Sequence, residues 1–219
     1  MTEARRLTIS YVEPDARRAA SVRVTCSSGT STSIPADRAV ALGLVPGRVL
    51  DERLSAELAA AADEEGALRA GLAALGRRSF ARAELGRRLR RRGHPVPAVS
   101  QALDRLAGMG LVDDARFVQG FIASRAERGR GPARLRRDLL ALGVAAPVIE
   151  AELVRVWPSG EADPSIPLSL ASRRSRQLGK LAVPAKRRRL LAFLARRGFT
   201  GPAAHSAVTT VLAAERRAG

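Results

Sequence analysis

The sequence has few of the residues on which most catalytic, metal-binding and disulfide-stabilised proteins depend. It contains one cysteine and two histidines in 219 residues. A single cysteine excludes an internal disulfide framework and a cysteine-rich metal site, and it fits a reducing compartment. One tryptophan, one tyrosine and five phenylalanines are the only aromatic residues, so an extended platform for stacking nucleobases is not expected.

Long apolar runs are also missing. The longest mostly apolar stretch, Leu139 to Ile149, is about half of the roughly 20 residues that a helix needs to cross a bilayer. The N-terminal residues lack the apolar centre of a signal peptide. We therefore expect a soluble, cytoplasmic protein with no membrane contact. A hydrophobic content of 46% is enough for packed cores and argues against wholesale disorder.

Arginine is the residue that the sequence has in excess. Lysine and arginine number 38 against 21 acidic residues, which gives a formal net charge of +17, and only Lys180 and Lys186 are lysines. Residues 1–62 carry a net charge of +1 and residues 63–219 carry +16. Because neutralised phosphates release counterions, this basic body predicts a polyanionic partner or a protein that coats one. The alternative is that the arginine content reflects only codon usage.

The basic body contains an internal repeat. Residues 84–106 align with residues 134–156 at a shift of 50 and with residues 189–211 at a shift of 105. Each copy has two leucines four residues apart, a glycine four residues later and a proline four residues after the glycine. These positions are Leu85, Leu89, Gly93 and Pro97, then Leu135, Leu139, Gly143 and Pro147, then Leu190, Leu194, Gly198 and Pro202.

Each repeated position has a physical reason. The leucines form an apolar stripe on one helix, the glycine suits a left-handed residue just after that helix, and the proline suits the first turn of the next. Apolar residues at spacings of three and four then predict the buried face of the second helix. These faces are Val99, Leu103 and Leu106 in the first copy, and Ile149, Leu153 and Val156 in the second.

A further helix is predicted before each pair. The first runs from about Glu64 to Arg77, with Leu68, Leu72 and Leu75 on one face. In the second, Asp113 and Asp114 occupy the capping region, and the third follows Asp163 and Pro164. The predicted fold is therefore mainly α: an elongated and curved tandem array of three three-helix repeats after a small β-containing N-terminal region. The predicted domains are 1–62, 63–112, 113–160 and 161–219.

The N-terminal region shows the alternation of strands. Residues 7–12 and 21–26 predict two strands, and residues 30–34 predict a third. Helices are expected at 36–42 and from Asp51 to about Ala62. The inward faces of the first two strands are predicted to hold Leu7, Ile9 and Tyr11, and Val22, Val24 and Cys26.

No catalytic motif is present. The sequence lacks the glycine-rich phosphate loops and the paired histidines or cysteines of zinc sites. His94 and His205 fall in different columns of the repeat, so we do not expect them to converge, and His94 is interpreted as a half-buried turn residue. Cys26 and Trp157 are interpreted as core residues. We predict no enzyme activity, no metal and no cofactor.

Basic residues recur beside the repeated leucines and could join into a stripe that contacts a polymer. The candidates are Arg87, Arg88, Arg90, Arg91 and Arg92 in the first copy, Arg134, Arg136 and Arg137 in the second, and Lys186, Arg187, Arg188 and Arg189 in the third. Two alternatives stay open at this point. The arginines can form a merely solvated face, and the helix–glycine–helix pattern is also that of a DNA-binding helix-turn-helix protein.

Several ordered motifs resemble the RecX family of bacterial recombination regulators. They are RAEL (82–85), GLVDDARF (110–117), SR-x-x-x-G-x-GP (124–132), RLRRDLLALGV (134–144) and PAKRRRLLAFLARRGF (184–199). The resemblance covers about residues 64–212, and the N-terminal region is similar to that of longer members. The sequence departs from the family at Arg130, where members often have an aromatic residue.

The resemblance implies a monomeric modulator of the RecA recombinase. Family members are tandem three-helix-repeat proteins that lie in the groove of the RecA–DNA filament and limit ATP hydrolysis, filament growth and strand exchange, with roles in homologous recombination, DNA repair and the SOS response. It implies at most weak, nonspecific binding to DNA alone. Arg125, Arg128 and Arg130 of the SR-x-x-x-G-x-GP segment join the candidates for contact with RecA or DNA.

Overall fold

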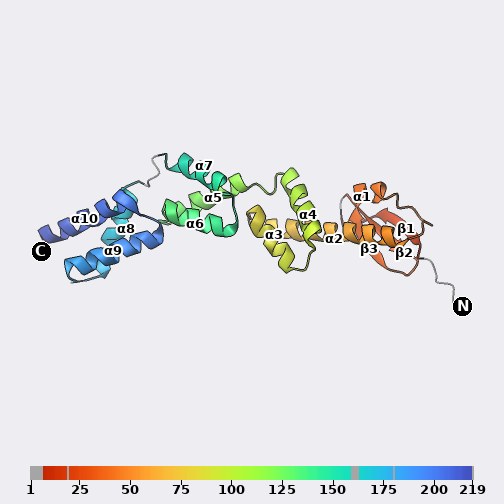
Figure 1. Cartoon of the computed structure of the whole chain (residues 1–219), viewed down its shortest axis with the longest axis horizontal. Coiled ribbons are helices and arrows are strands. Elements are labelled where there is room, and N and C mark those ends of the chain that lie inside the picture. The colour runs from red at the N-terminus through yellow and green to blue at the C-terminus, as the bar shows by residue number, and fades with distance from the viewer. Residues whose placement is uncertain (1–6, 19, 159–162, 180, 219) are drawn as a thin grey trace. The chain divides into compact units, whose positions relative to one another are not determined.

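The computed structural model describes residues 7–18, 20–158, 163–179 and 181–218 (Figure 1). Within them the chain forms ten α-helices and one three-stranded sheet. The described residues group into two compact units. Unit 1 ends at Val112 and lacks only Ala81–Ala83 of the preceding chain, and unit 2 contains Ala81–Ala83 and the residues from Asp113 onward. No helix among the described residues is long and apolar enough to span a membrane.

The predicted strands are present in unit 1. Strands β1 (Ile9–Pro14), β2 (Ser21–Cys26) and β3 (Ser31–Pro35) form an antiparallel sheet in the order β1-β2-β3. Their inward side chains pack with residues of α1 (Ala36–Ala41) and α2 (Glu52–Leu75) in one hydrophobic cluster. Cys26 is buried in this cluster, as predicted.

The prediction that Tyr11 faces inward is wrong, because 66% of this residue is exposed. Ile9 is paired with Cys26, whereas Tyr11 is paired with Thr25, so the register slips by one residue between Ile9 and Tyr11. Side chains alternate between the two faces of a sheet, and a slip of one residue therefore turns Tyr11 to the solvent side.

Helix α2 replaces two helices that the sequence predicted. It runs without interruption from Glu52 to Leu75, and the Asp51 carboxylate caps it by accepting a hydrogen bond from the Leu54 N–H at 2.7 Å. The N-terminal half of α2 packs against the sheet and its C-terminal half packs in the cluster of the first repeat (Figure 1). The chain has no glycine or proline between Glu52 and Glu65, so nothing breaks the helix there.

One leucine of α2 does not face the core. Leu68 is buried as predicted, but Leu72 is 39% exposed. Gly71 takes the inward position instead, so close to α4 that a Cβ atom on it would lie 2.7 Å from Leu106 Cδ1. The buried stripe of α2 therefore follows Ala67, Leu68, Gly71 and Ala74.

The remaining helices complete three successive groups of three. In unit 1, α3 (Arg82–Arg91) and α4 (Val96–Gly108) follow α2, although Arg82 and Ala83 belong to unit 2. The helices of unit 2 are α5 (Asp114–Ala126), α6 (Pro132–Leu142), α7 (Ala146–Val156), α8 (Ser165–Gln177), α9 (Val183–Arg197) and α10 (Gly201–Ala218). Asp113 caps α5, as expected, by accepting from the Arg116 N–H at 3.0 Å.

The repeated leucines and glycines have the predicted structures. All six leucines are fully buried. Gly93, Gly143 and Gly198 have φ angles of 91°, 87° and 92°, the left-handed conformation that ends a helix and that glycine adopts without strain. Pro97, Pro147 and Pro202 lie in the first turns of α4, α7 and α10.

The end of α7 departs from the prediction. Val156 is 46% exposed instead of buried, whereas the following residue, Trp157, is buried in the core of unit 2. The helix ends at Val156, and Trp157 has a φ of −130° and a ψ of 80°. The interpretation of Trp157 as a core residue is therefore confirmed.

Candidate functional site

The first question about a functional site is whether the described histidine, cysteine and acidic side chains come together. Within the described ranges, no group of three or more His, Cys, Asp or Glu side chains could hold a metal ion. His94 belongs to unit 1, where it is half-buried with its ring near Gly66 of α2, and His205 belongs to unit 2. His205 is exposed on α10, and its Nδ1 lies 2.9 Å from the Gly201 carbonyl oxygen. The other candidates that the sequence predicted are the basic residues of the helices.

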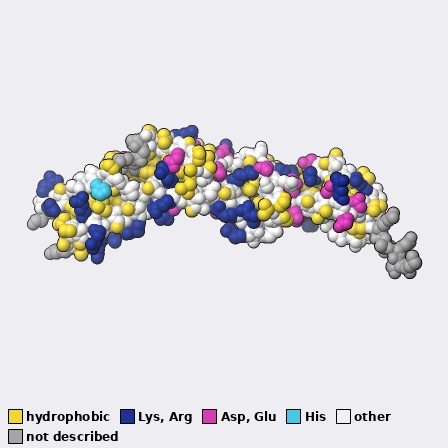
Figure 2. Space-filling model, viewed as in Figure 1, with side chains coloured by type: hydrophobic (Ala, Val, Ile, Leu, Met, Phe, Trp, Pro, Cys, Tyr) yellow, Lys and Arg dark blue, Asp and Glu magenta, His cyan; other side chains and the backbone are white. Residues whose placement is uncertain are grey.

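Unit 1 carries a dense group of arginines on α3. We call Arg87, Arg88, Arg90, Arg91 and Arg92 the α3 face; Figure 2 shows basic side chains gathered over this helix. Only Leu85, Gly86 and Leu89 of α3 are buried, so the arginines between them are left at the surface or its edge. Near the C-terminus of the helix, their charges also interact favourably with the helix dipole.

The arginines of the α3 face differ in how they are held. The Arg88 guanidinium lies 5.7 Å from the centre of the Phe80 ring, and its Nε is buried without a hydrogen-bond partner. Arg90, Arg91 and Arg92 are exposed. No described carboxylate pairs with these three, so their charge is available to a partner.

The candidates around α6 are mostly neutralised by carboxylates. Arg130 and Arg134 both pair with Asp138, at 2.8 and 2.9 Å, and Arg136 pairs with Glu150 on α7. Arg137 is exposed and has no carboxylate partner among the described residues. The α6 arginines thus offer less free charge than the sequence pattern suggested.

Helix α9 shows the same contrast between buried and exposed cations. Lys186 was predicted to face a partner, but it is only 8% exposed, and its Nζ donates to Glu215 Oε2 at 2.7 Å. It stands four residues before Leu190 on the buried stripe, so its stem packs inward. Arg187, Arg188 and Arg189, here called the α9 face, are exposed and lack a carboxylate partner within the described chain.

Two candidates in the SR-x-x-x-G-x-GP segment have different surroundings. The Arg125 guanidinium stacks 3.6 Å from the centre of the Phe121 ring, which places it in packing on α5. Arg128 is exposed after the end of α5. Arg125 of this segment therefore makes a cation–π contact, whereas Arg128 faces the solvent.

The glycines of this segment hold two helix groups together. The Gly131 N–H donates to the Arg197 carbonyl at 2.7 Å, and the Ala133 N–H donates to the Gly198 carbonyl at 3.3 Å. A Cβ on Gly131 would lie 2.5 Å from the Gly198 oxygen, and a Cβ on Gly198 would lie 2.4 Å from the Arg134 nitrogen. The motif thus has a structural role that its sequence did not reveal, because glycines that touch across a fold share no local signal.

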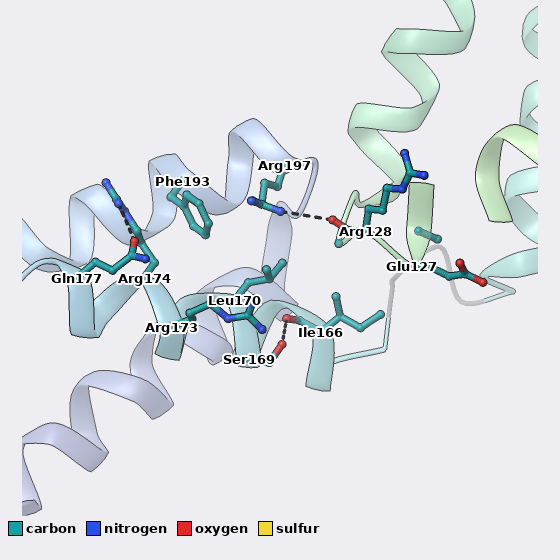
Figure 3. Close-up of a pocket in the computed structure, with 12 residues that line it drawn as sticks. Glu127, Arg128, Ile166, Ser169, Leu170, Arg173, Arg174, Gln177, Phe193 and Arg197 are labelled. Atoms are coloured by element: carbon teal, nitrogen blue, oxygen red, sulfur yellow. Dashed lines mark hydrogen bonds between the residues drawn. The ribbon is translucent and has the colours of Figure 1, made fainter. Parts of the chain in front are cut away.

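Beside this contact lies a cavity of 590 Å³ that sequence reasoning missed (Figure 3). We call it the α8–α9 cleft. Its charged lining consists of Arg128, Arg173, Arg174, Arg197 and Glu127, and its apolar lining includes Ile166, Leu170 and Phe193. Arg173 and Arg174 come from α8, and Phe193 and Arg197 from α9. The arginines of α8 lie outside the aligned part of the repeat, so the repeat gives no signal for them.

Comparison with known proteins identifies a matching family model and relatives of this chain in sequence. A family model described as the second three-helix domain of RecX matches residues 113–153. The regulatory protein RecX of Halorhodospira halophila is 40% identical over 144 residues, which cover 64% of this chain and 85% of that protein. The regulatory protein RecX of Mycobacterium avium is 38% identical over 140 residues, which cover 64% of this chain and 80% of that protein.

Solved structures agree on the fold. A crystal structure of regulatory protein RecX superposes with a TM-score of 0.74 at 19% identity, covering 94% of this chain and 98% of the other. RecX from Lactobacillus salivarius gives a TM-score of 0.60 at 16% identity, covering 68% of this chain and 96% of the other. The sequence relatives and the shared architecture together show that this chain belongs to the RecX family.

Proposed function

We propose that this protein binds the RecA filament on DNA as a cytoplasmic monomer and limits ATP hydrolysis, filament growth and strand exchange. Membership of the RecX family supports a regulatory role. The observation that carries the proposal is the unpaired arginine of the α3 face, where Arg90, Arg91 and Arg92 have no carboxylate partner in the described chain. Three adjacent exposed cations suit phosphates, or the carboxylates of a protein that coats DNA.

Autonomous helix-turn-helix binding is the weaker alternative. In such proteins the second helix of the pair enters the major groove and needs polar or basic side chains on its outer face. Here the single arginines of two of the second helices, α4 and α7, are paired with carboxylates. Arg105, the one arginine of α4, pairs with the buried Glu64 at 3.5 Å, and Arg155 of α7 pairs with Glu152. Arg90, Arg91, Arg137 and the α9 face, which lack a carboxylate partner among the described residues, lie on the first helix of their pairs. Arg216 and Arg217 are exposed at the C-terminal end of α10, whereas a recognition helix reads bases with its N-terminal residues.

The test is ATP hydrolysis by RecA on single-stranded DNA with substoichiometric amounts of this protein. We expect inhibition well below one protein per recombinase, and weaker inhibition by the Arg91→Ala/Arg92→Ala variant. The matched control is Arg17→Ala/Arg53→Ala, which removes the same charge from exposed positions of unit 1.

Two results would count against the proposal. Unchanged hydrolysis at every ratio would overturn it. A sequence-selective footprint on naked duplex DNA would favour the helix-turn-helix alternative instead. If both arginine variants inhibit like the unaltered protein, the α3 face has no part in the interaction and its charge is incidental.

A further inference from the structure

The α8–α9 cleft combines two kinds of lining within unit 2. Four arginines and one glutamate line it together with apolar side chains of Ile166, Leu170 and Phe193 (Figure 3). The cavity volume of 590 Å³ falls within the range of about 300–1,000 Å³ that is typical of ligand pockets. A ligand for this cleft must therefore offer both negative charge and apolar surface.

Two of the arginines of the cleft are held in place by contacts within unit 2. The Arg197 and Arg174 guanidinium groups lie 5.0 and 5.7 Å from the centre of the Phe193 ring. Arg174 also donates to Gln177 Oε1 at 2.9 Å, and Arg197 donates to the Arg128 carbonyl at 3.5 Å. A guanidinium has five N–H donors, so each retains donors for an anion, and its fixed orientation lowers the entropic cost of binding.

The positive charge of the cleft is not balanced from within. None of its four arginines pairs with a carboxylate in the described parts of the chain, although Glu127 lies at the margin. Arg173 is exposed and makes no side-chain hydrogen bond within those parts. Charge complementarity therefore calls for an external anion.

The apolar lining of the cleft distinguishes between two kinds of anionic ligand, a nucleic acid and an acidic peptide. A nucleic-acid backbone presents phosphate and sugar, which would leave Ile166 and Leu170 uncovered. A nucleobase could cover them, but base binding usually relies on aromatic stacking, and the one aromatic ring of the cleft already has two guanidinium groups near it. A peptide with an apolar side chain between carboxylates satisfies both parts of the lining.

We infer that the α8–α9 cleft binds an acidic peptide segment of a partner protein, with an apolar side chain against Leu170 and Phe193 and carboxylates on the arginines. This inference deepens the proposed function, on which it rests for the view that the partner is a protein filament. It assigns to unit 2 a protein-binding site separate from the arginines of the α3 face.

The test uses the full chain and a short fluorescein-labelled peptide in which a leucine pair is flanked on each side by glutamates. Fluorescence anisotropy gives its affinity for the unaltered protein, for Arg173→Ala and for Arg116→Ala, an exposed arginine of α5 outside the cleft. We expect Arg173→Ala to bind roughly tenfold more weakly, the effect of losing one charge-assisted hydrogen bond, and Arg116→Ala to bind normally. Replacing the peptide leucines by serine should weaken binding to a similar extent.

Trp157 fluorescence provides a check on folding, because this single tryptophan is buried in the core of unit 2. Equal binding by Arg173→Ala and Arg116→Ala, or equal binding of the serine peptide, would overturn the inference. The inference would also be overturned if oligothymidylate bound more tightly than the peptide and its binding were weakened by Arg173→Ala. The cleft would then be a nucleic-acid site. If peptide binding fails while RecA ATPase is still inhibited, the cleft inference alone is lost; if inhibition fails while the peptide binds, only the proposed function is lost.

Discussion

At the scale of single residues, the contact between Gly131 and Gly198 shows how the second and third helix groups are joined. Each glycine leaves room for the backbone of the other, and two backbone hydrogen bonds cross the contact. Such a close approach tolerates no side chain, because the nearest atoms are main-chain atoms that cannot move independently. The SR-x-x-x-G-x-GP segment therefore contributes to the integrity of unit 2.

We predict that Gly198→Ala destabilises unit 2 by about 3 kcal/mol. Of this, about 1 kcal/mol comes from the left-handed backbone at φ 92°, and the rest from the clash with Arg134 and Gly131. Urea unfolding followed by Trp157 fluorescence measures the loss.

Gly93→Ala is the matched control. Gly93 has a φ of 91°, but a Cβ on it would meet nothing within 4 Å. This variant should lose only the conformational part, about 1 kcal/mol, in urea unfolding followed by circular dichroism. Equal losses for the two variants would show that the glycine contact adds nothing to stability.

Acid should weaken unit 2 through Glu215. Hydrogen bonds from Lys186 and then Ser175 lower the pKa of the Glu215 carboxyl below its ordinary value. A carboxyl with a lowered folded pKa stabilises the fold above its unfolded pKa, and this contribution is lost as the pH falls through the folded pKa. We expect the urea midpoint of Trp157 fluorescence to fall as the pH drops below about 4.5, the ordinary pKa of a glutamate, and to fall less in Glu215→Gln.

The control for this titration is Glu127→Gln, which alters an exposed glutamate with no ion pair among the described residues. It should keep the pH dependence of the unaltered protein. Glu215→Gln should also be less stable at pH 7, because Lys186 is then buried without a carboxylate. An unchanged pH dependence in Glu215→Gln would contradict the assignment.

Lys186 and Tyr11 show what the sequence could and could not predict for single residues. Lys186 stands four residues before Leu190 and eight before Leu194, so its place on the buried stripe was readable from the spacing. The exposure of Tyr11 could not be predicted in this way. The bulge that turns Tyr11 outward depends on how β1 pairs with β2, and the local sequence does not indicate that pairing.

At the scale of elements, α2 connects the sheet to the first helix group of unit 1. Its buried carboxylates point to neighbouring elements: Glu64 lies 3.5 Å from Arg105 of α4 and 3.9 Å from Arg38 of α1, and Glu65 accepts from Ser21 of β2 at 3.1 Å. Glu64, where the sequence predicted that a helix starts, therefore lies in the middle of α2. Acidic residues favour a helix N-terminus only weakly. Here the contacts of Glu64 and Glu65 with other elements determine where these residues lie in the helix.

Asp63→Pro tests the continuity of α2. In an uninterrupted helix, proline at this exposed interior position removes a hydrogen bond and clashes with the preceding turn, so we expect a loss of about 3 kcal/mol or more. If a new helix began at Asp63, proline would suit its first turn and stability would change little. Circular dichroism during urea unfolding measures the difference, and Asp63→Ala, which should be nearly neutral, is the control.

The arrangement of the helices also determines how much of the candidate site could be predicted from the sequence. The α3 arginines stand beside an aligned leucine, so the repeat in the sequence is enough to predict them. The α8–α9 cleft has no such signal, because Arg173 and Arg174 come near Arg197 only when α8 packs beside α9. Hydrophobic periodicity predicts which face of a helix is buried, but it does not predict which helices meet.

At the scale of the whole molecule, free charge is unevenly distributed over the repeats. The sequence predicted basic residues beside the repeated leucines of each copy, yet carboxylates neutralise most of the arginines of α6, and Lys186 is buried. The arginines without a carboxylate partner in the described chain include Arg90, Arg91 and Arg92 in unit 1, and the α9 face and the arginines of the α8–α9 cleft in unit 2. Each unit thus has exposed arginines of its own that are not neutralised by described carboxylates.

Salt dependence can show whether the α3 face meets phosphate or protein. Each arginine that neutralises a phosphate of single-stranded DNA adds about 0.7 to the slope of log affinity against log salt concentration. If Arg91 and Arg92 contact DNA in the RecA filament, Arg91→Ala/Arg92→Ala should lower that slope by about 1.4 relative to Arg17→Ala/Arg53→Ala, measured by anisotropy on filaments formed on labelled DNA. An unchanged slope with weaker affinity would mean that the two arginines contact recombinase carboxylates, and an unchanged slope with unchanged affinity would exclude the α3 face from the interface.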